Sequence, residues 1–265
     1  MKRYVASCSF GKDSMATVIL ALEHSEPLDE VAYCEVMFDE HTSGEVPEHR
    51  EFIHTVAIPF LKKAGIKVNV VKGAKTFVGQ FQHEIRSGDH AGQIWSWPLC
   101  GKCYVQRDLK VRPMDAWKKK NWKNDEIIQY VGIADDEMDR LARMDSYKYK
   151  TISLLEKYGI SEAQAIEICR EHGLLSPIYE FANRNGCFFC PNAKNRELRH
   201  LYDYHPDLWD RLIELQRLPN KVTERFTREL RFDEIDAMFR MDDAQFDIFA
   251  EREPTPFDIG GGMES

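Results

Sequence analysis

The hexapeptide SFGKDS at residues 9–14 combines residue types that bind phosphate. It follows the strand-like run RYVASC and leads into the helical pattern of residues 14–24. At a strand-to-helix turn, unpaired backbone N–H groups and the positive end of the helix dipole face one point, which attracts anions. The glycine permits a close approach of the backbone, and the serines add hydroxyl donors. We predict that this turn binds a nucleotide phosphate tail, through Ser9, Phe10, Gly11, Lys12, Asp13 and Ser14.

Lys12 and Asp13 are the residues of this turn that we expect to act in catalysis. The lysine would neutralise negative charge on the phosphates. The aspartate would repel a phosphate directly, so its expected role is to bind Mg²⁺ or to cap the helix. The residue order differs from the G-x-x-x-x-G-K-[ST] loop of the common NTPases. The alternative without a ligand is a capped helix after a tight turn.

Two C-x-x-C pairs, in the segments PLCGKC and GCFFCPN, form a second group of residues that could do chemistry. Two residues between cysteines let both thiolates bind one metal. Residues 104–186 separate the pairs, far more than the ~15–20 residues of a compact zinc ribbon. We therefore predict one site that joins an early and a late part of the chain. Its ligands are Cys100, Cys103, Cys187 and Cys190.

Four soft thiolates select either zinc or an iron–sulfur cluster. Pro191 directly follows the last cysteine, and Phe188 and Phe189 would form an apolar wall that keeps water away. These features favour a 4Fe–4S cluster, and Zn²⁺ remains the alternative. Three further cysteines lie within apolar segments and are expected to be core residues: Cys8, Cys34 and Cys169.

The elements that must position these groups alternate between strands and helices up to about residue 150. This alternation predicts an α/β fold with a parallel sheet and helices on both faces. A serine-to-glutamine capping-box pattern begins a helix at residues 161–173, and amphipathic helices follow. We predict a nucleotide-binding core (1–150), a mainly helical C-terminal region that supplies half of the cysteine site (151–252) and a flexible tail (253–265). The expected strands of the core are 3–8, 30–38, 66–73 and 127–133.

Composition limits the classes of partner. The net charge of −8 and the pI of about 5.7 argue against a large nucleic-acid footprint. A local exception is WKKKNWK (117–123), which is either a nucleic-acid contact or the solvated end of a helix. His200 and His205 are expected on a solvated helix face rather than at a metal. No apolar run is long enough to span a membrane, and no signal peptide begins the chain, so we expect a cytoplasmic protein with no membrane partner.

SFGKDS resembles the SGGKDS-type pyrophosphate loop of the ATP pyrophosphatase and phosphoadenosine phosphosulfate (PAPS) reductase superfamily. Residues 38–53 are similar to the segment that follows the second strand in PAPS reductases. Residues 132–143, GIADDEMDRLAR, resemble the glycine-to-arginine segment after a later strand of that family. The resemblance covers about residues 5–145. It implies nucleotide contacts at Asp39, Thr42, Gly44, Gly132 and Arg140.

This resemblance implies a Rossmann-like, doubly wound sheet of the HUP type that binds ATP or an adenylyl nucleotide with Mg²⁺. Adenylylsulfate reductases of the superfamily hold a 4Fe–4S cluster, although their first cysteine pair is adjacent, unlike Cys-Gly-Lys-Cys. Sulfonucleotide reductases take their nucleophilic cysteine from a C-terminal segment, whereas no cysteine follows Cys190 here. We therefore favour adenylation of an acceptor, with pyrophosphate release, for sulfur transfer.

Two alternatives remain at this point. One is a true phosphoadenylyl-sulfate or adenylyl-sulfate reductase. The other is a zinc-stabilised regulator that binds nucleotides or nucleic acid without turnover. The expected partners of the favoured enzyme are an adenine nucleotide, a small-molecule or nucleic-acid acceptor, and a protein that donates sulfur or electrons.

Overall fold

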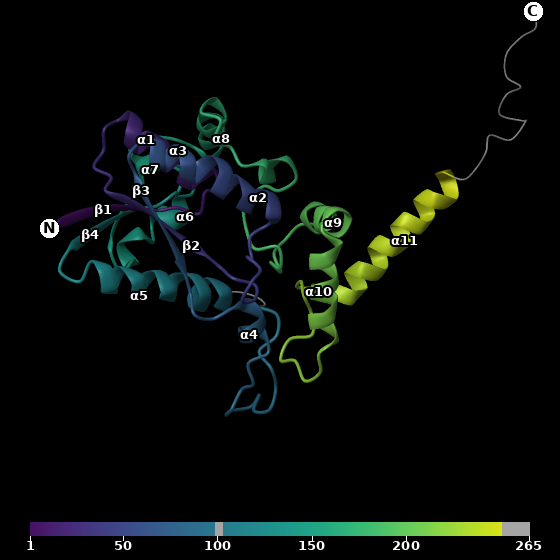
Figure 1. Cartoon of the computed structure of the whole chain (residues 1–265). Coiled ribbons are helices and arrows are strands. Elements are labelled where there is room, and N and C mark those ends of the chain that lie inside the picture. Colours follow the sequence, from purple (N-terminus) through teal and green to yellow (C-terminus); the bar gives the residue numbers. More distant parts are fainter. Residues whose placement is uncertain (99–102, 251–265) are drawn as a thin grey trace, which may run out of the picture.

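A five-stranded parallel sheet forms the centre of the molecule (Figure 1). The computed structural model describes residues 1–98 and 103–250, with side chains up to residue 244. The predicted α/β fold with a parallel sheet is confirmed. The strand order is β3-β2-β1-β4-β5. The strands are β1 (Lys2–Ser7), β2 (Glu30–Glu35), β3 (Lys67–Lys72), β4 (Glu126–Tyr130) and β5 (Lys150–Ile152).

The two faces of the sheet bury different apolar residues, as the period of two in a strand requires. On one face Ala6 and Val31 belong to a core formed with α1, α3, α7 and α8. On the other face Val5 and Ala32 pack with Trp122, on the side of the sheet where α5 lies (Figure 1). The sheet is thus doubly wound. The helices named here are α1 (Lys12–Glu23), α3 (Ile58–Lys63), α5 (Arg112–Asn121), α7 (Leu154–Lys157) and α8 (Glu162–Glu171).

A helical stretch from Pro47 to Lys63 consists of three joined pieces. Pro59 lacks the N–H that would bond to the preceding turn. The structure accommodates it with a π-helical segment, Ile53–Ala57, between α2 (Pro47–Phe52) and α3. Because of this interruption, α2 is a short separate helix, and it begins at the carboxyl edge of the sheet.

The order of the strands creates a switch point at the centre of the sheet. The chain runs from β1 outward through β2 to β3, and then returns to place β4 on the other side of β1. The loops that leave β1 and β4 therefore lie side by side at the carboxyl ends of these two paired strands. In open α/β sheets, ligands bind at such a switch point. The loop that follows β1 contains the SFGKDS segment.

An aromatic core separate from the sheet packs the C-terminal helices against the loops that follow β2. Phe77 stacks on Phe189 with ring centroids 3.8 Å apart, and Phe38 lies against Phe188 and Phe189. Trp97 and Trp209 are fully buried in the same cluster. The elements that supply it are α4 (Phe77–Phe81), α9 (Asn195–Tyr204), α10 (Pro206–Arg217) and α11 (Phe232–Ala250), of which α11 extends away from the body in Figure 1.

The expected boundary after residue 150 falls inside β5. Leu154, Leu155 and Ala165 belong to the first core because α7 and α8 pack on α1. That core continues to Leu174. The division into domains remains a prediction, and the tail at 253–265 lies outside the described residues. None of the described helices has the length and apolar character needed to span a membrane.

The remaining short elements connect these layers. A π-helical segment, Val105–Val111, precedes α5, and α6 (Met138–Leu141) with a 3₁₀ turn, Met144–Ser146, connects β4 to β5. A second 3₁₀ turn, Pro177–Glu180, follows α8. This last turn crosses the carboxyl edge of the sheet and becomes part of the candidate site.

Candidate functional site

The SFGKDS segment forms the turn between β1 and α1 that the sequence predicts. Phe10 has a positive φ of 59°, a conformation that strains a bulky side chain, and it is fully buried against Tyr33. The Ser14 hydroxyl accepts from the Ser9 N–H at 3.2 Å and donates to the Gly11 carbonyl at 3.0 Å. These contacts fix the loop in a tight shape. Gly11 precedes α1 as its N-cap, without a side-chain cap.

The segment at residues 176–185 covers this loop. The Lys12 N–H donates to the Tyr179 hydroxyl at 2.7 Å, and the Asn185 amide donates to the Ser9 carbonyl at 3.2 Å. A Cβ atom on Gly11 would lie 2.5 Å from the Asn185 side-chain oxygen. Burial raises the pKa of Tyr179, so its hydroxyl stays protonated. It can therefore accept from the helix start and still donate to a phosphate oxygen.

His49 supports the loop from α2. Its Nε2 lies 3.0 Å from the Ser9 carbonyl, and its Nδ1 lies 2.8 Å from the Ser176 hydroxyl. Burial lowers the pKa of His49, so the ring is neutral. Because a carbonyl only accepts, the proton must lie on Nε2. His49, Tyr179 and Asn185 were not identified from the sequence, because each reaches the loop from a distant element.

The buried Lys12 forms an ion pair with the half-buried Asp13 at 2.7 Å, and it also pairs with Glu162 of α8 at 2.9 Å. Burial alone would lower the pKa of Lys12, but the two carboxylates outweigh it and raise that pKa. Burial raises the pKa of Asp13 despite the lysine. A phosphate that enters must therefore compete with Asp13 and Glu162 for the ammonium group. Glu162 is a further residue that the sequence did not reveal.

Gly132 lies directly against the start of α1. A Cβ atom there would lie 2.6 Å from the Asp13 carbonyl carbon and 2.6 Å from the Ser14 nitrogen. The loop after β4 thus touches the phosphate loop, as expected at the switch point. The guanidinium of Arg140 pairs with Glu137 on the surface. Their roles as nucleotide contacts remain predictions.

The predicted Asp39, Thr42 and Gly44 form a turn after β2. The Asp39 carboxylate accepts from the backbone N–H groups of His41 and Thr42 at 2.8 and 2.6 Å, and it pairs with Arg211 of α10. Burial opposes ionisation of this carboxyl, but these contacts lower its pKa to about 2. The turn is therefore locked to the C-terminal region. Nucleotide contacts at these residues remain predictions.

Gly44 permits the second cysteine pair to reach the sheet. Its carbonyl accepts from the Phe188 N–H at 3.0 Å, and Glu45 forms an antiparallel bridge with Cys187. A Cβ atom on Gly44 would lie 2.9 Å from the Phe189 ring. The GCFFCPN segment is thereby attached beside the turn that follows β2.

Three of the four predicted cysteine ligands belong to the described residues, and Cys100 lies outside them. Burial, the charge of Glu45, and then the neighbouring Cys190 and Cys103 raise the pKa of Cys187 well above its usual value. The guanidinium of Arg184 donates to the Cys190 sulfur at 3.3 Å. The structure thus brings Cys103 near the second pair, across a long stretch of chain.

This donor set fits a thiolate-bound metal centre. Burial and the nearby negative charges raise the pKa of Cys187, and a metal ion would offset this effect because it binds the thiolate. Four soft thiolates suit either a 4Fe–4S cluster or Zn²⁺. The preference for a cluster remains a prediction.

The other cysteines are core residues, as predicted. Cys8, Cys34 and Cys169 are each at most 3% exposed. Burial raises the pKa of Cys8 and Cys34 to about 11 and that of Cys169 to about 12. All three are therefore protonated at neutral pH, and none is a ready nucleophile.

The burial of residues in the WKKKNWK run does not fit its interpretation as a nucleic-acid contact. Lys118 is 2% exposed, and its ammonium group reaches Gln129 and Ser7 beneath α5. Burial lowers the pKa of Lys118 to about 8. Trp122 is also buried, with its ring packed edge-on against Trp117. Two of the seven residues of the run, Lys118 and Trp122, thus belong to the interior and cannot contact a nucleic acid.

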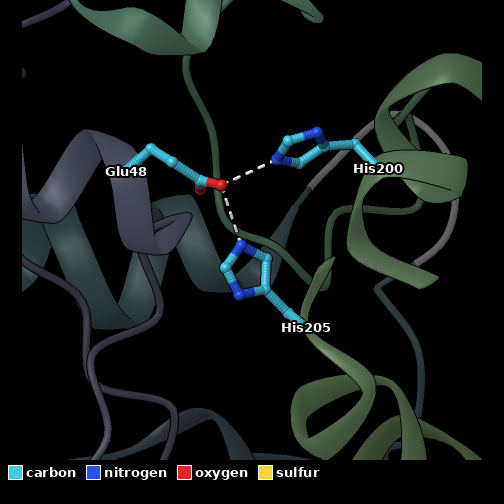
Figure 2. Close-up of side chains that lie close together, drawn as sticks. All are labelled: Glu48, His200 and His205. Carbon is cyan, nitrogen blue, oxygen red and sulfur yellow. Dashed lines mark hydrogen bonds and ion pairs between the residues drawn. The ribbon is translucent and has the colours of Figure 1, made fainter. Parts of the chain in front are cut away.

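His200 and His205 also differ from the expectation of a solvated face. Both Nε2 atoms contact Glu48 of α2, as Figure 2 shows. Burial would raise the pKa of Glu48, but hydrogen bonds from His200, from the glutamate's own backbone and from His205 lower it overall. The two histidines therefore join the C-terminal helices to the core.

Comparisons with known proteins add limited information. No family model and no curated protein matches the sequence. Among solved structures, the chain is similar to the U34-tRNA thiolase NcsA from Methanococcus maripaludis with its [4Fe-4S] cluster. The TM-score is 0.44 and the identity 12%, over 80% of this chain and 67% of that chain. The interpretation of the site rests on its own geometry.

We predict that Gly132→Ala weakens binding of Mg·ATP by roughly tenfold or more, because its methyl group must displace the start of α1. Isothermal titration calorimetry measures the affinity. Gly186→Ala is the matched control, since a Cβ atom there meets nothing within 4 Å. Equal affinities of Gly132→Ala and the wild type would show that this contact does not shape the loop.

The Asp39 carboxylate makes stability depend on pH. Its folded-state pKa of about 2 lies below the ordinary value of 3.8, so its contribution is present above pH ~4 and is lost as pH falls through about 2. We predict that Asp39→Asn costs about 1–2 kcal/mol of unfolding free energy at pH 7. Denaturant titrations should show this loss shrinking between pH 4 and pH 2.

Asp89→Asn, at an exposed position, serves as the control and should leave stability unchanged at each pH. If Asp39→Asn lowers the free energy of unfolding by the same amount at every pH down to 2, the result would contradict the role of the ionised carboxylate.

Proposed function

We propose that this chain binds ATP with Mg²⁺ at the SFGKDS loop and adenylates an acceptor, with release of pyrophosphate, for sulfur transfer. The observation that carries the proposal is the position of this loop. It lies at the start of α1 and at the carboxyl end of the central strand, where loops from β1 and β4 meet. The basic and acidic residues proposed for adenylyl chemistry, buried Lys12 and half-buried Asp13, form an ion pair there.

The loop supplies the groups that this reaction needs. An acceptor oxygen attacks the α-phosphorus of ATP, and the bond between the α-phosphorus and the bridging oxygen breaks. Pyrophosphate then leaves with that oxygen and its negative charge. Lys12 and the N–H groups at the start of α1 stabilise this charge. Asp13 would hold Mg²⁺, which neutralises the phosphates when it is bound.

Tyr179 controls access to the first N–H of α1. Its hydroxyl accepts from Lys12 in the absence of nucleotide. A phosphate oxygen at this position takes over the N–H or receives the hydroxyl proton of Tyr179 in a hydrogen bond. The C-terminal region thereby contributes to the nucleotide site as well as to the cysteine centre.

The second half-reaction requires a sulfur nucleophile. Sulfur attacks the activated carbon of the acceptor, and AMP leaves with the oxygen. Cys100, Cys103, Cys187 and Cys190 would hold a 4Fe–4S cluster, which when bound supplies the sulfur to be transferred. The acceptor is a small molecule or a nucleic acid, and a partner protein supplies sulfur or electrons. We place the reaction in the cytoplasm, where thiols stay reduced.

The thiols of the described residues favour adenylation over the strict reductase. A sulfonucleotide reductase needs a cysteine thiolate that attacks sulfur. Cys8, the cysteine nearest the loop in sequence, has its pKa raised to about 11 by burial. Its sulfur accepts a hydrogen bond from the Phe10 N–H at 3.3 Å inside the core.

The decisive experiment follows pyrophosphate release by chain reconstituted anaerobically with iron and sulfide. Candidate acceptors include unmodified transfer RNA and small heterocycles with an exocyclic oxygen. We predict that Lys12→Gln lowers kcat/KM by roughly 100-fold or more, because one charge on the leaving pyrophosphate loses its partner. Lys119→Gln, a change of the same type at an exposed position, should retain full activity.

Thermal unfolding of both variants must be measured, since Lys12 also pairs with two carboxylates. A folded Lys12→Gln chain with wild-type turnover would contradict the proposed role of the lysine. Binding of ATP without turnover on any acceptor would contradict the proposed reaction.

A further inference from the structure

A glutamate and two histidines from three separate elements converge beside the aromatic core. Glu48 lies in the first turn of α2, His200 lies in α9, and His205 joins α9 to α10. The Glu48 Oε1 atom is 2.7 Å from His200 Nε2 and 2.9 Å from His205 Nε2. Figure 2 shows both rings pointing their Nε2 atoms at the carboxylate. The three atoms lie within 4.8 Å of one another.

One atom of this cluster lacks a partner. Glu48 Oε2 is buried and has no hydrogen-bond partner among the described residues. A buried carboxylate oxygen without a partner is costly, and such atoms point to an unobserved ion or water. A cation between the glutamate and the histidines would satisfy it. The same cation would remove the need for both imidazoles to donate to one oxygen.

The imidazole rings are held in place before any ion binds. Phe181 stacks on His200 with ring centroids 3.5 Å apart and planes 7° apart. Tyr204 packs on the same ring at 4.7 Å. The backbone of His205 is fixed by its N–H to Leu201 and by its carbonyl, which accepts from Trp209. Ligands held in this way lose little entropy on binding a metal.

We propose that Glu48, His200 and His205 bind a divalent transition-metal ion and leave a coordination position open to water. Two imidazole nitrogens and one carboxylate are the ligand set of open zinc sites and of non-haem iron sites. This nitrogen and oxygen set differs from the four thiolates, which select softer centres. The metal site is therefore separate from the cysteine centre.

The position of the ion explains why it matters to the chain. His49, the residue after Glu48, contacts the phosphate loop at the Ser9 carbonyl. His200 lines a small cavity together with Cys187 and Cys190. The ion would thus tie α2 to α9 and α10, between the nucleotide loop and the cysteine centre. This inference stands on the triad alone and does not depend on turnover of ATP.

The experiment uses Co²⁺ as the probe, added to full-length chain freed of metal under anaerobic conditions. Cobalt bound to thiolates gives an intense near-ultraviolet charge-transfer band, whereas cobalt bound to the triad gives only weak visible bands. We expect the total Co²⁺ bound per wild-type chain to exceed, by one ion, the Co²⁺ bound to thiolates as measured from the charge-transfer band. Glu48→Gln and His205→Gln should lose this additional ion, with affinity weaker by roughly 100-fold or more.

His54→Gln is the matched control, because His54 is exposed on the π-helical segment that continues α2. It should bind as many ions as the wild type. A retained thiolate band in each variant shows that the chain is folded and that its cysteine centre is intact. The same number of Co²⁺ ions, bound with the same affinity, in wild type, Glu48→Gln and His205→Gln would overturn the proposal.

Discussion

The start of α1, at the carboxyl end of the central strand, is the feature on which the rest of the structure depends. A helix that begins there directs N–H groups and its positive dipole end toward the carboxyl edge of the sheet, beside the loop that follows β4. Gly132 lets the neighbouring loop pack directly on this helix start, because a Cβ atom at Gly132 would lie 2.6 Å from the Ser14 nitrogen. Burial makes the charges of Lys12 and Asp13 interdependent. The proposed binding of a nucleotide phosphate rests on this helix start, where Lys12 is paired with Asp13 and Glu162 and its N–H donates to Tyr179.

The C-terminal region completes the site rather than merely adjoining it. Tyr179 and Asn185 contact the phosphate loop, and Cys187 pairs with the chain beside the turn after β2. Arg211 locks that turn through Asp39, with its guanidinium 4.4 Å from the centre of the Phe38 ring. The aromatic core makes these contacts rigid. The phosphate loop and the later cysteine pair are therefore joined through one packed interface.

The features predicted from the sequence are those that local patterns specify. Alternating apolar runs indicated the parallel sheet, and the SFGKDS turn was located because its residues are contiguous. The C-x-x-C spacing likewise suggested the shared cysteine site, which remains a prediction. Contacts across the fold were missed. Glu48 and His205 come together only because the aromatic core docks α10 near α2, and Lys118 is buried because α5 lies on the sheet. One sequence does not show which surfaces meet.

The most direct measurement is a calorimetric titration of the intact chain with Mg·ATP, in competition with pyrophosphate and with adenosine. If the start of α1 binds the phosphate tail, ATP binds at one site per chain, and pyrophosphate displaces it more effectively than adenosine does. Displacement by adenosine alone, or no heat from any adenine nucleotide, would contradict the account.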